Sequence, residues 1–130
     1  MRKLLLLLPL FIVYSCQENE TLLKLLDSAQ QLTIYIDKDV GNKRTRTFAM
    51  ETKSKEEILK LADYISDENS PDYKCSYDGV IQLKTTKGDV EMKFNLRSDC
   101  KHIVYTVDGK RYTKKLTQDG WEFLKSLYNK

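Results

Sequence analysis

The sequence predicts an α+β domain, in which an antiparallel β-meander carries helices packed on one face. Several segments of strand length alternate apolar and polar residues, which is typical of strands with one buried face. Two-residue turns such as Asp108-Gly109 separate some of these segments. Two other segments repeat apolar residues at helical spacing. The predicted order is β-β-α-β-β-β-β-α, within one domain spanning residues 21–130.

The chain begins with a short apolar segment. Arg2 and Lys3 precede an apolar run over residues 4–13 that only Pro9 interrupts. A membrane-spanning helix needs about 20 apolar residues, so this run is too short to be one. Its length and its charged start are typical of a signal peptide. We therefore expect residues 1–15 to be a signal peptide.

The residues that follow suggest why a cysteine ends this segment. Val13-Tyr14-Ser15-Cys16 resembles a bacterial lipobox, although Tyr14 stands where a small residue is usual. The resemblance implies lipid transfer to the Cys16 thiol, cleavage after Ser15 and anchoring in the bacterial outer membrane, facing the periplasm or the surface. Residues 16–20 are then a lipidated cysteine with a polar tether. The acidic tether resembles the surface-export signal of Bacteroidetes lipoproteins, and a solvated linker explains it equally well.

Net charge argues against a nucleic-acid partner. The chain has 22 Lys and Arg against 19 Asp and Glu, a net charge of +3, and two of these cations lie in the expected signal peptide. The remainder therefore carries a net charge of +1, whereas nucleic-acid binding calls for a basic patch. We interpret the densest basic cluster, Lys43-Arg44-Thr45-Arg46, as a solvated hairpin tip.

The first half of the domain predicts a hairpin and a helix. Residues 21–30 could be a short helix or part of the tether; the helical alternative rests on one apolar face made of Leu22, Leu25, Leu26 and Ala29. Alternation around Ile34 predicts a strand, and Gly41-Asn42 predicts a turn into a partner strand over residues 44–52. Ser54 and Glu57 form a capping-box pattern. The helix they begin should bury Ile58, Leu61, Ala62 and Ile65 and end in a polar loop over residues 67–72.

The second half predicts the meander and a closing helix. Strands over residues 80–86 and 89–97 should meet around Lys87-Gly88, and strands over residues 102–107 and 110–116 should meet at Asp108-Gly109. The second of these turns sets Tyr105 opposite Tyr112. Thr117 can cap a final helix with an apolar face of Trp121, Phe123, Leu124, Leu127 and Tyr128.

Cys75 and Cys100 predict a disulfide, because an even pair of cysteines in an oxidising compartment usually forms one. With Lys87-Gly88 as the turn, Thr86 faces Asp89, and the same register places Cys75 opposite Cys100. Opposed strand positions lie close enough for a disulfide. Their nearness would also suit a reduced, metal-binding pair.

Residues with catalytic potential are few. His102 is the only histidine, and we expect a surface or half-buried imidazole rather than a catalytic base or a metal ligand. With Cys75 and Cys100 it could supply only three zinc ligands, so no metal and no cofactor is predicted. We interpret Asp67, Glu68 and Asp72 as solvated loop charge. The tyrosines 73, 77, 105 and 112 could form an exposed binding patch or be half-buried sheet aromatics.

Two family resemblances bear on function. The segments YKCSYDGVIQL, FNLRSDCKHIVYTVDGKRY and WEFLKSL resemble small Bacteroidetes lipoproteins without an assigned activity, which implies an envelope location only. Tyr73-Lys74-Cys75 and Gly109-Lys110-Arg111-Tyr112 are similar to the Y-x-C and G-x-R-Y segments of bacterial C-type lysozyme inhibitors, which implies a disulfide-bearing β-barrel. We expect a non-enzymatic, membrane-anchored lipoprotein with a binding, structural or accessory role and an unidentified envelope partner; the alternative is an inhibitor of a hydrolase such as lysozyme.

Overall fold

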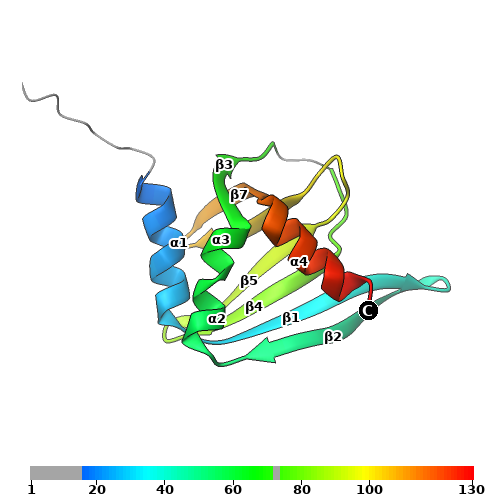
Figure 1. Cartoon of the computed structure of the whole chain (residues 1–130), viewed down its shortest axis with the longest axis horizontal. Coiled ribbons are helices and arrows are strands. Elements are labelled where there is room, and N and C mark those ends of the chain that lie inside the picture. The colour runs from blue at the N-terminus through cyan, green and yellow to red at the C-terminus, as the bar shows by residue number, and fades with distance from the viewer. Residues whose placement is uncertain (1–15, 72–73) are drawn as a thin grey trace, which may run out of the picture.

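The computed structural model describes residues 16–71 and 74–130, without the side chains of residues 16–19. The helices all lie on one face of an antiparallel sheet (Figure 1). The predicted α+β class is therefore confirmed. In chain order the elements are α1 (Cys16–Ser28), β1 (Ala29–Val40), β2 (Lys43–Thr52), α2 (Lys55–Leu59), α3 (Leu61–Tyr64), β3 (Ile65–Asn69), β4 (Gly79–Thr85), β5 (Gly88–Asn95), β6 (His102–Val107), β7 (Lys110–Leu116) and α4 (Gln118–Tyr128).

Within residues 16–71 and 74–130 the sheet has seven strands in the order β2-β1-β4-β5-β6-β7-β3, so β2 and β3 are its edges. The sheet is open, which differs from the closed barrel that the resemblance to lysozyme inhibitors implies. The core lies between the sheet and the helices, where alternate strand residues such as Ile34, Ile81, Met92 and Ile103 are buried. Among the described residues, no helix is long and apolar enough to cross a membrane.

Residues 21–28 are helical, which decides between the two alternatives for this segment, but Ala29 and Gln30 begin β1 and are not part of the predicted helix. Leu22, Leu25 and Leu26 of α1 are buried, with exposed fractions of 7% or less, because they pack into the core as the helical spacing predicted. The backbone is helical from Cys16, so residues 16–20, which are predicted to be a lipidated cysteine and polar tether, form the start of α1. The expected signal peptide, residues 1–15, lies outside the described residues.

One strand was missing from the predicted order. The middle helix divides at Lys60 and ends at Tyr64, and β3 follows as an edge strand, pairing Ile65 with Leu116 of β7. Ile65 is buried as predicted, but in a strand. The helix ends here because the start of α4 takes up its last carbonyl groups: Thr117 donates its N–H to the Tyr64 oxygen (3.0 Å) and its hydroxyl to the Asp63 oxygen (2.8 Å).

Of the two hairpins predicted for the meander, one is confirmed and the other has a different register. The turn at Asp108-Gly109 is confirmed, and the rings of Tyr105 and Tyr112 stack with centroids 5.3 Å apart. Thr85 faces Gly88, so the loop between β4 and β5 is Thr86-Lys87 and not the predicted Lys87-Gly88. Each residue of β4 therefore faces a partner two positions away from the predicted one.

Cys75 and Cys100 nevertheless form the predicted disulfide, with Cα atoms 6.8 Å apart. Both cysteines lie in loops, before β4 and after β5, so their pairing does not depend on the strand register. The bond joins the segment that leads from β3 into β4 to the turn between β5 and β6.

Candidate functional site

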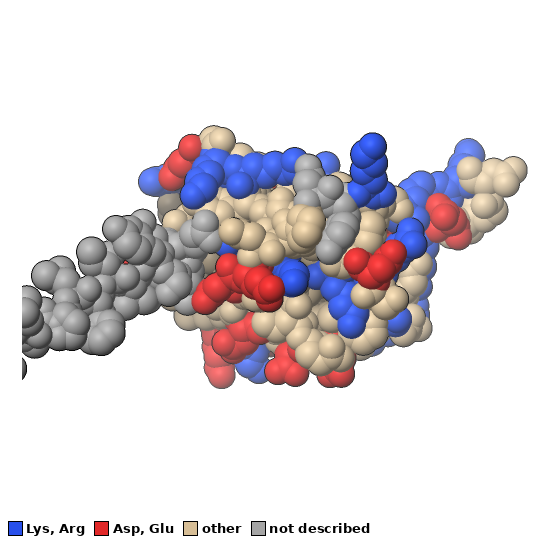
Figure 2. All heavy atoms as spheres, turned by 90° about the horizontal axis from the view of Figure 1, so that it is seen from above, with Lys and Arg blue, Asp and Glu red and all other residues tan. Residues whose placement is uncertain are grey.

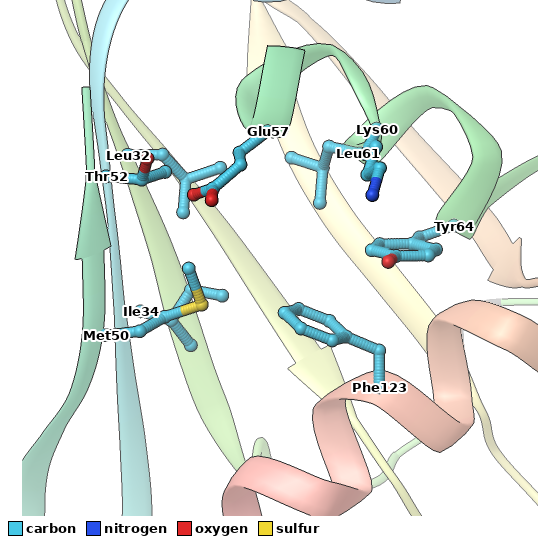
Figure 3. Close-up of a pocket in the computed structure, with 9 residues that line it drawn as sticks. All are labelled: Leu32, Ile34, Met50, Thr52, Glu57, Lys60, Leu61, Tyr64 and Phe123. Carbon is cyan, nitrogen blue, oxygen red and sulfur yellow. The ribbon is translucent and has the colours of Figure 1, made fainter. Parts of the chain in front are cut away.

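A half-open cavity of about 210 Å³ lies on the helix side of the sheet, between the β1–β2 hairpin and helices α2 to α4 (Figure 3). We call it the main cavity because core residues form its floor, although other cavities on the surface are larger. Its lining comes from both layers of the fold and consists of Leu32, Ile34, Met50, Thr52, Glu57, Lys60, Leu61, Tyr64 and Phe123. The cavity lies where α2 and α3 stand apart from α4 above the β1–β2 hairpin (Figure 3).

The floor of the main cavity is part of the hydrophobic core. Leu32, Ile34 and Leu61 have exposed fractions of 3% or less, so their positions are set by core packing. The Tyr64 and Phe123 rings form one wall and stack with centroids 4.9 Å apart. Met50 of β2 faces them, and its unbranched thioether can adapt to the shape of an apolar guest.

The rim of the main cavity is charged. Glu57 and Lys60 are exposed, and the Glu57 carboxylate is directed from α2 toward the strands (Figure 3). Half of the predicted capping box is present: Ser54 Oγ accepts the N–H of Glu57 at 3.4 Å. The other half is replaced, because the N–H of Ser54 is donated to Thr52 Oγ1 at 3.1 Å. The Glu57 carboxylate is therefore available at the rim.

This arrangement suits the capture of an apolar group. A cavity of 150 Å³ lined by aliphatic and aromatic residues can hold a benzene ring, so the main cavity has room for a branched or aromatic side chain. Complete sites for drug-sized molecules usually start at about 300 Å³. The cavity is therefore sized for one anchoring group of a larger partner.

A second cavity of about 290 Å³ continues along the same hairpin, and we call it the edge cavity. Ile36, Thr47, Phe48, Ala49 and Leu127 line it, with Lys38 and Lys130 beside them. The Lys38 ammonium lies 4.6 Å from the centre of the Tyr128 ring, an arrangement that holds it near the end of α4. Both cavities are thus bordered by residues of β2.

The candidate site residues of the sequence analysis lie apart from these two cavities. The expectation that His102 is exposed or half-buried was wrong, because its exposed fraction is 0%. It lies at the start of β6 on the other face of the sheet, with the Tyr77 ring 6.1 Å away. Tyr77 and the chain around it cover this end of the face, which the strand pattern could not predict.

The three tyrosines of this set that the structure describes do not form one patch. Tyr105 and Tyr112 are buried on the helix side, whereas Tyr77 is half-buried on the opposite face, and Tyr73 lies outside the described residues. In the G-x-R-Y segment, Arg111 is exposed on the helix-free face. Arg111 and Tyr112 therefore point to opposite faces and cannot contact one partner together.

The predicted loop acids are solvated where the structure describes them. Asp67 and Glu68 are exposed, and Glu68 forms an ion pair with Lys115 at 2.9 Å. They belong to β3 rather than to a loop, and Asp72 lies outside the described residues. In the part of the chain that the structure describes, no group of three or more His, Cys, Asp or Glu side chains is arranged to hold a metal ion.

Charges are distributed unevenly over the surface. Figure 2 shows Lys and Arg side chains gathered along one margin of the molecule and many of the Asp and Glu side chains along the opposite margin. On the helix-free face of the hairpin the basic cluster is paired: Arg46 binds Asp37 at 2.8 Å and Arg44 binds Asp39 at 3.3 Å. The hydrogen bond from Arg46 to Asp37 raises the pKa of Arg46 above its usual value. The predicted exposed hairpin tip is confirmed.

The sequence analysis did not identify either cavity. It predicted that Leu61 is buried and that a strand surrounds Ile34, which is correct. The gap above these residues depends on how the helices are placed on the sheet. Met50 in a strand and Phe123 in a helix carry no joint signal in the sequence.

No protein-family model, no curated protein and no solved structure matches this chain.

Proposed function

We propose that this chain is a lipid-anchored envelope protein that binds a partner by accepting an apolar group of that partner in the main cavity. The observation that supports this function is the half-open apolar cavity with its floor in the core and with Glu57 and Lys60 at its rim. A rigid apolar floor beneath a polar rim is the usual composition of a binding site. The charged groups at the rim are in contact with water, which favours recognition over acid–base catalysis.

The lipid anchor rests on the sequence around Cys16. Each buried methylene contributes about 0.8 kcal/mol, so two or three acyl chains would hold the protein firmly on a membrane. In this proposal α1 connects the anchor directly to the domain, because the helix begins at Cys16 and its apolar residues pack into the core. A helix of 13 residues is about 20 Å long, so the domain would stay close to the bilayer.

Incorporation of labelled palmitate tests the anchor. The wild-type protein should carry the label and fractionate with membranes, and Cys16→Ala should lose both properties. Cys100→Ser is the matched control, because it removes a cysteine that takes part only in the disulfide. Equal label in the wild type and Cys16→Ala would contradict the anchor.

Binding of the fluorescent apolar probe anilinonaphthalene sulfonate tests the main cavity. Met50→Trp places a large ring at the cavity wall and should weaken probe binding by about tenfold, equivalent to ~1.4 kcal/mol. Lys84→Trp adds the same ring at an exposed position on the helix-free face of β4 and should leave binding unchanged. Equal probe binding by the two variants would exclude the main cavity. Loss of lysozyme activity on mixing with the domain would instead favour the inhibitor alternative.

A further inference from the structure

Strand β2 is an edge strand that offers backbone hydrogen-bonding groups along its outer side. It spans Lys43–Thr52 and pairs only with β1 among the described strands. Figure 1 shows it along the lower margin of the sheet, with no described element beyond it. Such an edge can accept a further strand from another chain. The presence of Phe48, with an exposed fraction of 56%, adds apolar surface to this edge.

The spacing of the two cavities along β2 matches the spacing of side chains on one face of a strand. On the helix side of β2, Met50 borders the main cavity and Thr47 borders the edge cavity. Ala49 is an extra residue in a bulge, because Ile34 pairs with Met50 while Tyr35 pairs with Phe48 and Ile36 with Thr47. Met50 and Thr47 are therefore two ladder positions apart. In an added strand, side chains two residues apart would lie beside the two cavities.

The helix side of the hairpin also has positive charge near its tip. Lys38 lies one ladder repeat beyond Ile36, Lys43 starts β2, and Lys130 borders the edge cavity. Within the described part of the chain, no ion pair involves these three lysines, whereas Arg44 and Arg46 are paired with aspartates on the other face. The other end of β2 is close to Glu51 and Glu57. An acidic side chain of a bound strand would therefore be most stable near the tip of the β1–β2 hairpin, beside these lysines.

We propose that β2 binds an extended acidic peptide of a partner protein as an added antiparallel strand, with the pattern apolar-x-apolar-x-acidic. The two apolar side chains enter the main and edge cavities, and the acidic side chain meets Lys38 and Lys43. Antiparallel addition continues the pairing of the whole sheet and places the acidic end of the peptide at the lysines. This inference rests on the proposed function, since it specifies the partner whose apolar group the main cavity accepts.

A second copy of the chain fits the same edge less well. Antiparallel pairing of two β2 strands about a two-fold axis at Thr47 would align Thr45 of the copy with Met50 and Thr47 of the copy with Thr47. The cavities would then receive threonines instead of larger apolar groups. The pairing would also bring no carboxylate to Lys38. The peptide is therefore a better occupant than a second copy paired in this register.

A synthetic peptide with leucine at its second and fourth positions, glutamate at its sixth and threonine elsewhere tests the proposal. In a strand, alternate N–H groups point toward the neighbouring strand, so N-methylation of one alternate set should abolish binding and N-methylation of the other set should preserve it. Nuclear magnetic resonance should show hydrogen-exchange protection of β2 amides in the complex. Equal binding by both methylated peptides would overturn strand addition.

Charge variants test the direction of the peptide. Lys38→Glu and Lys43→Glu should each weaken binding by at least about fivefold, and changing the peptide glutamate to lysine should restore binding to these variants. Lys84→Glu is the matched control, because Lys84 is exposed on the helix-free face of β4. Equal effects at all three positions would overturn the proposed register.

Two further outcomes separate this inference from its premise. If anilinonaphthalene sulfonate binds the main cavity but no peptide protects β2, the strand-addition proposal fails and the proposed function stands. If light scattering gives twice the monomer mass without peptide and β2 amides are already protected, the edge pairs with a second copy and the peptide proposal is wrong.

Discussion

Gly120 allows the start of α4 to lie directly against the end of α3, because glycine has no side chain. We call this contact the joint between α3 and α4. A Cβ atom at this position would lie 2.3 Å from the Tyr64 oxygen and 2.7 Å from the Tyr64 Cβ, both far inside van der Waals contact. The close approach allows Thr117 to bond to the carbonyl groups that end α3. The wall of the main cavity depends on the same joint, because Tyr64 and Phe123 stack across it.

We expect Gly120→Ala to lower the free energy of unfolding by about 1–3 kcal/mol, measured by denaturant unfolding, because overpacking forces the two helices apart. In an exposed helix the same change would stabilise by up to about 1 kcal/mol. Glu122→Ala, at an exposed site on the same helix, should change stability by no more than about 0.5 kcal/mol. An increase in the stability of Gly120→Ala would contradict this prediction, because it would show that the two helices can move apart without a loss of stability.

Single residues also show the limits of the sequence pattern. Asp108-Gly109 was recognised as a turn because both residues need positive φ, and they have φ values of 51° and 79°. His102 was misjudged, because its burial depends on the loop that precedes β4 and crosses toward this end of the sheet. A lone histidine at a strand start contains no information on a segment that is distant in sequence.

At the scale of elements, α1 is part of the domain. The helical spacing of Leu22, Leu25 and Leu26 predicted one apolar face, but an amphipathic segment of this length is marginal as an isolated helix. Its stability therefore comes from packing against the sheet and the other helices, which the sequence could not establish. The middle helix shows the opposite case, since its pattern continued through Ile65 but tertiary contacts ended it at Tyr64.

Leu26→Ala tests the role of α1. Leu26 has an exposed fraction of 0%, so the substitution should leave a cavity and lower the free energy of unfolding by about 2–5 kcal/mol. Leu23→Ala is the matched control on the same helix, because Leu23 is 41% exposed, and it should change stability much less. Equal and small effects in chemical denaturation would mean that α1 acts only as a tether.

At the scale of the whole molecule, the disulfide holds together parts that the sheet order separates. The chain leaves β3 at one edge and enters β4 between β1 and β5, so the intervening segment must pass three strands. Cys75 joins this segment to Cys100, and the Asp78 N–H donates to the Phe94 oxygen at 2.8 Å close by. These contacts fix the crossing segment where it enters the meander.

We expect a Cys75→Ser, Cys100→Ser double variant to lose about 3–4 kcal/mol of stability, because the bond closes a loop of 25 residues in the unfolded chain. Thermal unfolding with and without reductant measures the loss. A wild-type melting temperature that does not respond to reductant, or two thiols that alkylate freely under denaturing, non-reducing conditions, would contradict the bond.

The sequence by itself determined the α+β class, the strands with alternating patterns, the Asp108-Gly109 turn, the Tyr105–Tyr112 pair and the Cys75–Cys100 bond. These features follow from periodicity, turn chemistry and cysteine number, all of which are readable in neighbouring residues. Only the tertiary structure decided the edge strand β3, the two-residue shift between β4 and β5, the burial of His102 and the two cavities along β2. Each of these depends on contacts between residues far apart in the chain, where small differences in packing free energy choose between arrangements that local patterns allow equally.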